Sequence, residues 1–224
     1  MSERYSRQMK IKWWDQKKIN NTNCMIVGVG GIGTTTSILL TFLGIRKIVL
    51  VDMDKVEKSN LNRQMFYEKD VGKYKVEAMK EKLLNINPKL KIETFDCKIE
   101  EIDKKVFKNI HFVFDCLDNI KTREHIAKFC WDNKIPFIHS ACSVSVGEVQ
   151  LIVNGKTKHM REYPKEMKKD EERRSCLDYD ASVCTTNMIT ASLQVDKFLD
   201  YIVNKDVSKP FVNYVRNNGV GYSG

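Results

Sequence analysis

Residues 23–33 read NCMIVGVGGIG, and the architecture of the chain can be built outward from them. Asn23–Gly28 is a short apolar run that ends in glycine, which is typical of a strand buried in a parallel sheet. Apolar residues at helical spacing follow over Gly31–Leu43, and a second buried strand is expected at Arg46–Val51. Strand, glycine turn, helix and strand in this order predict a βαβ unit that binds a nucleotide.

The rest of the chain continues the alternation of strand and helix patterns. Strands are expected at Leu90–Phe95, His111–Asp115, Pro136–Ser140 and Gly147–Val153, and helices at Tyr74–Leu84, Glu101–Phe107, Thr122–Asn133 and Thr185–Val203. The sequence therefore predicts an α/β fold: a Rossmann-like, doubly wound, mainly parallel sheet with an antiparallel edge and helices on both faces. We expect residues 204–224 to form a C-terminal tail that contributes little to the core.

Composition narrows the class of protein. Of the 224 residues, 42% are hydrophobic and 30% charged, which is a globular balance, and the net charge of +9 suits acidic partners or a merely lysine-rich chain. No apolar run is long enough to span a bilayer, and the N-terminus lacks the apolar core of a signal peptide. None of the seven cysteines has C-x-x-C spacing. We therefore expect a soluble, cytoplasmic protein without disulfides or a membrane partner.

The glycines fit G-x-G-x-x-G directly after a strand and at the start of a helix. Glycine is needed there because the chain turns tightly and its backbone approaches a phosphate at the positive end of the helix. The candidate cradle is Gly28, Gly30, Gly31 and Gly33. Asp52 ends the next strand, which is the position from which a carboxylate binds ribose hydroxyls.

A polar segment, DMDKVEKSNLNRQ at residues 52–64, follows the second strand. Ligands of a doubly wound sheet bind at this edge, and a triphosphate with magnesium needs such carboxylates, amides and arginine, whereas hydride transfer does not. The candidates are Asp52, Asp54, Asn60, Arg63 and Gln64. The structural alternative is a capped turn in which Ser59 and Asn60 act as N-cap residues.

The glycine motif and D-x-D-x-V-x-x-S-N-L-N-R-Q resemble the adenylating domain of the ThiF/MoeB/ubiquitin-activating enzyme (E1-like) family. Four further segments agree with that family: RYSRQ at 4–8, GKYK at 72–75, DCLDNIKTR at 115–123 and NKIPFIHS at 133–140. The resemblance implies a single E1-like adenylation domain over residues 1–203. It also makes the charged stretch around 155–176 a crossover loop that would close over a substrate tail, although such charge is equally typical of a solvated loop.

The resemblance implies adenylation of the C-terminal glycine of a ubiquitin-like or sulfur-carrier protein by ATP and Mg²⁺. It assigns roles by position: ribose binding to Asp52; phosphate binding to Asn60, Arg63, Gln64 and Lys75; Mg²⁺ and carboxylate orientation to Asp118; and a contact across a homodimer to Arg7. Cations must neutralise both the attacking carboxylate and the α-phosphate, so Arg7, Arg63 and Lys75 are catalytic candidates. A carboxylate needs no general base, so no histidine is assigned a catalytic role.

Two departures concern cysteine. The paired C-x-x-C motifs that bind structural zinc in many family members are absent, so no zinc is expected. A thioester-forming thiol would be Cys176, which follows the charged loop beside Arg173 and Arg174, and those arginines would favour its thiolate. Cys184, at the expected start of the last helix, is the competing candidate.

Two other functions stay open. An enzyme related to the tRNA-modifying dehydratases would adenylate a carboxylate on a modified tRNA base, although the RYSRQ segment with Arg7 argues against it and nucleic acid is not the expected partner. A non-catalytic subunit of a heterodimeric activating enzyme would be expected to lack phosphate-binding residues, and Arg63, Lys75 and Asp118 are present.

Overall fold

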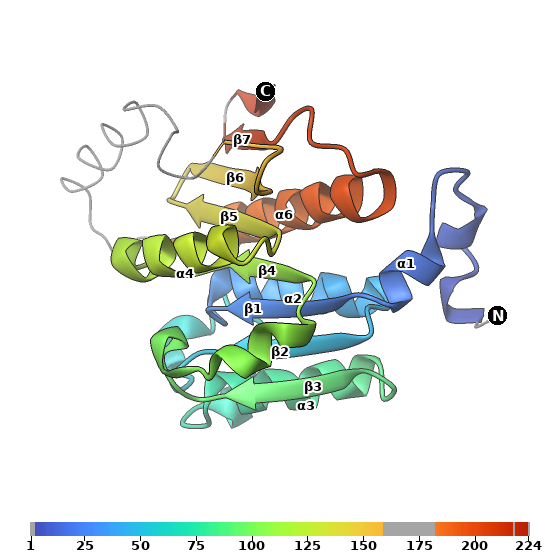
Figure 1. Ribbon diagram of the computed structural model, residues 1–224. Coiled ribbons are helices and arrows are strands. Elements are labelled where there is room, and N and C mark those ends of the chain that lie inside the picture. Colours follow the sequence, from blue (N-terminus) through green and yellow to red (C-terminus); the bar gives the residue numbers. More distant parts are fainter. Residues whose placement is uncertain (1–2, 159–181, 217, 224) are drawn as a thin grey trace.

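The computed structural model describes residues 3–158, 182–216 and 218–223. They form one eight-stranded sheet in the order β3-β2-β1-β4-β5-β6-β7-β8 (Figure 1). The strands are β1 Asn23–Val27, β2 Lys47–Val51, β3 Lys91–Phe95, β4 Phe112–Asp115, β5 Phe137–Cys142, β6 Val146–Ile152, β7 Phe211–Val215 and β8 Gly219–Ser223. Neighbours from β3 to β5 pair in parallel and those from β5 to β8 antiparallel. The predicted doubly wound sheet with an antiparallel edge is confirmed.

Helices cover both faces of the sheet. The α-helices are α1 Gln16–Asn20, α2 Gly31–Leu43, α3 Lys75–Ile86, α4 Ile120–Asp132 and α6 Cys184–Asn204, and the 3₁₀ helices are η1 Glu3–Tyr5, η2 Gln8–Lys10, η3 Lys58–Asn60, η4 Glu68–Asp70, η5 Ile99–Glu101 and η6 Lys104–Asn109. Helices α2, α3 and α6 lie on one face, and α4 with η5 and η6 on the other (Figure 1). No helix among the described residues is long and apolar enough to cross a membrane.

The single helix expected at Glu101–Phe107 is wrong, because two 3₁₀ helices occupy that region instead. The Asp103 carboxylate accepts the Lys105 N–H at 2.8 Å, which caps a new short helix and ends the preceding one.

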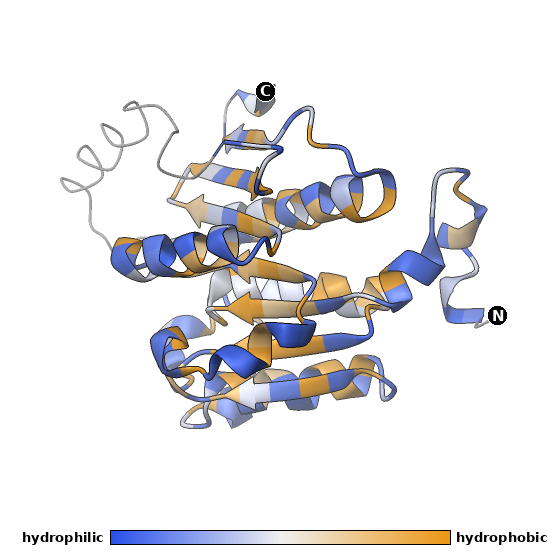
Figure 2. Cartoon of the chain, in the orientation of Figure 1, coloured by the Kyte–Doolittle hydropathy of each residue, from blue (hydrophilic) through white to orange (hydrophobic). Residues whose placement is uncertain are grey.

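The core has two layers, one on each face of the sheet. The central strands β1, β2 and β4 are hydrophobic along most of their length, whereas the helices alternate apolar and polar residues (Figure 2). Phe112 and Phe114 of β4 pack against Phe198 of α6, and all three side chains are fully buried. This burial on both faces explains why the parallel strands appear in the sequence as continuous apolar runs.

The segment after α6 corrects a second prediction. Strands β7 and β8, Phe211–Val215 and Gly219–Ser223, extend the sheet beyond β6, and Val212 is fully buried against the α6 side of the core. The expectation that residues 204–224 add little to the core is therefore wrong. The alternation in FVNYV at residues 211–215 is that of a strand with one buried face.

Candidate functional site

The glycine turn lies between β1 and α2, where the carboxyl ends of β1 and β4 meet. Gly28 has φ of +91°, and a Cβ there would lie 2.5 Å from the Cys116 carbonyl oxygen at the end of β4. A Cβ on Gly33 would overlap the Gly28 carbonyl oxygen. These two glycines are therefore required for the backbone to turn and for the two strand ends to approach each other.

Gly30, unlike Gly28 and Gly33, has no atom of the described residues close to the position of a Cβ. The nearest protein atom to a Cβ built there is Gln64 Nε2, at 3.9 Å. Gln64 is 8% exposed, and its Oε1 has no hydrogen-bond partner among the described residues. A helix start with unpaired N–H groups, room at Gly30 and an unpaired amide beside it fits the phosphates and donor groups of a nucleotide.

Asp52, Asp54 and Lys75 form a connected charged cluster beside this turn. Asp52 Oδ2 accepts the Val29 N–H at 2.6 Å, and its Oδ1 accepts the Asp54 N–H at 2.8 Å. Burial raises the pKa of Asp52, while the Lys75 charge and the two hydrogen bonds act in the opposite direction. Lys75 is buried and pairs with Asp54 at 2.8 Å. The structure thus brings a cation to the acids that follow β2.

The other candidates after β2 lie in a loop that is hydrogen-bonded to α2. Met65 N–H donates to Thr34 Oγ1 at 3.2 Å. Asn60 is buried and accepts the Glu57 N–H at 3.1 Å, so Glu57, rather than Ser59 or Asn60, is the N-cap of η3. Arg63 donates to the Ser59 carbonyl oxygen at 2.8 Å, so its guanidinium is turned toward its own loop.

Asp118 lies on the turn that follows β4, and its side chain is exposed. This turn packs closely on Gly28: a Cβ built on Gly28 would lie 3.1 Å from Leu117 N. The Asn119 side chain accepts the Thr122 N–H at 3.2 Å and caps α4 directly after the turn. Asp118 is therefore held at the same edge as the glycine turn, between a strand end and a capped helix.

Three predicted residues are not brought into this cluster. Arg7 is exposed in the N-terminal segment, whose next residue, Gln8, donates to the Leu43 carbonyl oxygen at the end of α2 far from its glycine start. Cys176 lies outside the described residues, as does most of the expected crossover loop. Cys184 is half-buried at the first residue of α6.

Sequence reasoning missed Asn187, which closes the site from α6. Its Oδ1 would collide with a Cβ on Gly31, and its Nδ2 donates to Ser182 Oγ and the Val183 carbonyl oxygen, both at 2.8 Å. The side chain is 4% exposed. The available signal was an amide at helical spacing from the apolar residues of α6, since a buried amide needs hydrogen-bond partners.

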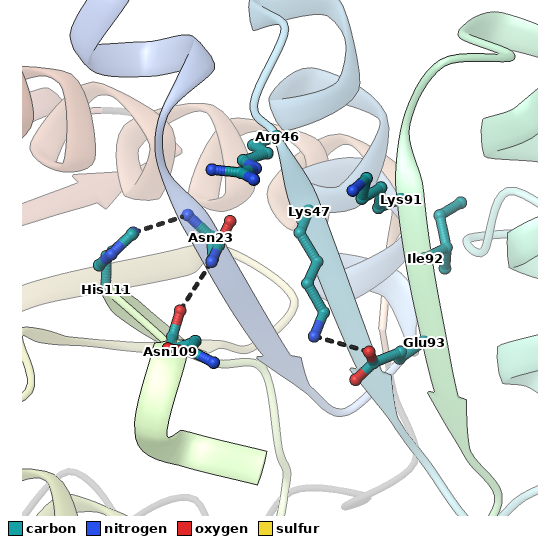
Figure 3. Close-up of a pocket in the computed structure, with 8 residues that line it drawn as sticks. All are labelled: Asn23, Arg46, Lys47, Lys91, Ile92, Glu93, Asn109 and His111. Carbon is teal, nitrogen blue, oxygen red and sulfur yellow. Dashed lines mark hydrogen bonds and ion pairs between the residues drawn. The ribbon is translucent and has the colours of Figure 1, made fainter.

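A pocket of about 550 Å³ lies at the opposite edge, where β1, β2 and β3 begin (Figure 3). Its lining residues are Asn23, Arg46, Lys47, Lys91, Ile92, Glu93, Asn109 and His111. Lys47 pairs with Glu93 at 2.7 Å, and Asn23 bonds to His111 and Asn109. None of the predicted site residues lines it, so it is separate from the candidate site. Among the described residues, no group of three His, Cys, Asp or Glu side chains could hold a metal ion.

The strand order, the glycine turn after β1 and the polar loop after β2 define a Rossmann-like α/β protein with a candidate nucleotide site at the carboxyl edge of its parallel strands. Comparison with known families gives the particular one. The sequence matches the ThiF family over residues 5–222, and the chain belongs to this family. The resemblance based on the motifs is thereby confirmed.

Individual proteins similar to this chain agree with the family assignment. The chain is 31% identical to ubiquitin-like modifier-activating enzyme 5 of Drosophila virilis over 95% of its own length and 59% of the relative's. It is 34% identical to the molybdopterin-synthase adenylyltransferase of Haemophilus influenzae over 66% of its length and 63% of the relative's. The fold matches a crystal structure of E. coli MccB with ATP with a TM-score of 0.82 and 24% identity, covering 100% of this chain and 72% of MccB. The chain thus spans about three fifths of the length of the two curated relatives.

Proposed function

We propose that this chain catalyses the ATP-dependent adenylation of the C-terminal glycine carboxylate of a ubiquitin-like or sulfur-carrier protein, with release of pyrophosphate. The observation that carries the proposal is the convergence at one sheet edge of an open glycine cradle at Gly30, the Asp52–Lys75 cluster and the Asp118 turn. Membership of the ThiF family and relatives named as activating enzymes and adenylyltransferases support it.

The site's chemistry suits this reaction. A carboxylate is ionised at neutral pH, so the site needs no general base but must neutralise two negative reactants. Lys75 can exchange its partner Asp54, which is half exposed, for a phosphate oxygen, and Arg63 can turn from its own loop to the phosphates. Asp52 keeps lone pairs free for the ribose hydroxyls after accepting its two backbone N–H groups.

In this proposal Asp118, whose side chain is exposed, holds Mg²⁺ and orients the incoming carboxylate. When bound, Mg²⁺ supplies positive charge to the phosphate oxygens. The Asp118 carboxylate itself fixes the direction of approach, because the turn that carries it is packed against Gly28.

Assembly and the later fate of the acyl group form the second part of the proposal. Arg7 lies away from the glycine turn of its own chain, which suits a homodimer in which it reaches the partner's nucleotide. A relative named SUMO-activating enzyme subunit 2, from Dictyostelium discoideum and 34% identical over 70% of this chain and 24% of the relative, makes a heterodimer the alternative. Cys176 is the proposed thiol for a subsequent thioester, with Cys184 as its competitor.

ATP–pyrophosphate exchange with Mg²⁺ and small β-grasp proteins that end in glycine tests the proposal. Exchange that requires such a protein, and that is lost in Asp118→Ala while the fold is retained, supports it. ATP binding without exchange for any carrier favours a tRNA-type substrate, and no ATP binding at millimolar Mg-ATP favours a non-catalytic subunit. A reductant-sensitive conjugate that is lost in Cys184→Ala and not in Cys176→Ala would reverse the choice of thiol.

A further inference from the structure

We propose that His139 and Asp115 are positioning residues for the site, fixing the backbone of the turn Cys116–Asp118 from beneath so that Asp118 is presented to the nucleotide. The inference rests on the proposed role of Asp118. Neither His139 nor Asp115 was assigned a role from the sequence, and both are buried, with exposures of 6% and 0%.

The Asp115 carboxylate connects the turn to the neighbouring strand. Its Oδ1 accepts the Leu117 N–H at 3.0 Å, and its Oδ2 lies 2.7 Å from His139 Nδ1. Because a carboxylate only accepts, His139 Nδ1 donates this bond. His139 is the direct partner of Asp115 in the β4–β5 ladder, so its ring is held on a rigid element. The Leu117 N–H, in the middle of the turn, is thus attached to β5 through a single carboxylate.

The backbone carbonyl group of Leu117 is held by Arg123 of α4. Arg123 Nη2 donates to the Leu117 carbonyl oxygen and, at 3.2 Å, to the Ser140 carbonyl oxygen. Its Nε lies 3.8 Å from Asp115 Oδ2 and has no hydrogen-bond partner among the described residues. Both polar groups of Leu117 are therefore fixed, one residue before Asp118.

Stability alone does not account for the buried network of Asp115, His139 and Arg123. Buried charged and polar groups contribute little net stability, and apolar side chains of similar volume often do as well. The turn is also in contact with the glycine turn, since a Cβ on Gly28 would meet both the Cys116 carbonyl oxygen and Leu117 N. A displacement of the Asp118 backbone would change the distance between its carboxylate and phosphates bound over the glycine turn, and misplacement by about 1 Å costs on the order of 100-fold in rate.

The test compares His139→Leu, which removes the donor, with His139→Asn, whose Nδ2 can replace Nδ1. Leu83→Ala is the matched control, because Leu83 is fully buried in α3, away from the turn, and its truncation lowers the melting temperature without touching this network. Hydrogen exchange of the Leu117 amide reports on the turn directly. Two further quantities report on the site. They are the Mg²⁺ concentration for half-maximal ATP–pyrophosphate exchange and the KM for ATP in that reaction.

We expect His139→Leu to speed Leu117 amide exchange at least about tenfold and to raise the Mg²⁺ requirement about 10- to 100-fold. His139→Asn should restore most of both properties, and Leu83→Ala should change neither. Unaltered Leu117 exchange and Mg²⁺ requirement in His139→Leu, or equal changes in Leu83→Ala, would overturn the proposal. Because amide exchange needs no carrier protein, a wild-type chain without adenylation activity refutes the proposed function and leaves the positioning of the turn separately measurable.

Discussion

Replacing Gly30 by alanine separates a glycine required by the fold from one required by a ligand. The nearest protein atom to the added Cβ is 3.9 Å away, an ordinary van der Waals distance, and φ at Gly30 is −90°. The substitution also lowers the entropy of the unfolded chain, which is worth about 0.4–1 kcal/mol. We therefore expect the free energy of unfolding to change by less than about 1 kcal/mol.

Nucleotide affinity should respond very differently. The Cβ would occupy the open space that we assign to the phosphates, and a displaced phosphate loses one or two charge-assisted hydrogen bonds to backbone N–H groups, each worth about 1.5–3 kcal/mol. A loss of about 3 kcal/mol corresponds to a rise of roughly 100-fold in the Kd for ATP.

Calorimetric titration with Mg-ATP measures the affinity, and urea unfolding measures the stability. Two glycine variants serve as controls. Gly72→Ala, where φ is +89° and nothing lies within 4 Å, should cost about 1–2 kcal/mol of stability and leave the Kd unchanged. Gly33→Ala should unfold the turn, because its Cβ would overlap the Gly28 carbonyl oxygen. A folded Gly30→Ala protein with the wild-type Kd would refute the placement of the phosphates over Gly30.

Three further outcomes follow from single side chains. Lys75→Met should lower ATP–pyrophosphate exchange by about 100-fold or more, because it removes the cation of the Asp52–Lys75 cluster; unchanged exchange would place the phosphates elsewhere. Gln150→Leu should raise the free energy of unfolding by about 1–3 kcal/mol in urea, since both polar atoms of this buried amide lack partners among the described residues, and a loss of stability would contradict this. Burial raises the pKa of Cys116 to about 12 and raises that of Cys24, so both thiols stay protonated at pH 8 and should escape iodoacetamide until the protein is unfolded; labelling of either in the native protein would refute this protection.

Most of the fold could be predicted from the sequence because its strands are buried on both faces and separated by helices. The run NCMIV became β1 as expected, and the carboxyl ends of β1, β2 and β4 carry the glycine turn, Asp52 and Asp118. The hairpin of β7 and β8 was missed although Asn218-Gly219 follows the alternating FVNYV segment, and Gly219 has φ of +80°. An Asn-Gly pair beside such alternation is a strong local hairpin signal. The prediction of a tail instead followed the general rule that residues near a chain terminus are poorly ordered.

The side-chain partnerships at the site could not be predicted in the same way. The pairing of Lys75 with Asp54, the contact of Asn187 with the glycine turn and the bond of His139 to Asp115 each join residues far apart in sequence. Motif spacing places a residue at an edge of the sheet, but the packing of neighbouring elements decides which polar groups it meets. The histidines were left without a catalytic role, and His139 still lies at the centre of the polar layer beneath the site.

The topology explains why these groups converge where they do. The strand order reverses at β1, which lies between β2 and β4, so the glycine turn opens into the crevice where ligands of doubly wound sheets bind. Gln194 of α6 crosses beneath this crevice, accepting from Thr36 of α2 and donating to the Asp115 and Ile138 carbonyl oxygens. Since α6 also carries Cys184 and Asn187 in its first turn, this one helix contacts the glycine turn through Asn187, supports the end of β4 through Gln194 and carries one of the two candidate thiols. For the proposed adenylation, this shared support would bring a carrier tail bound at the start of α6 beside the glycine turn that Asn187 contacts.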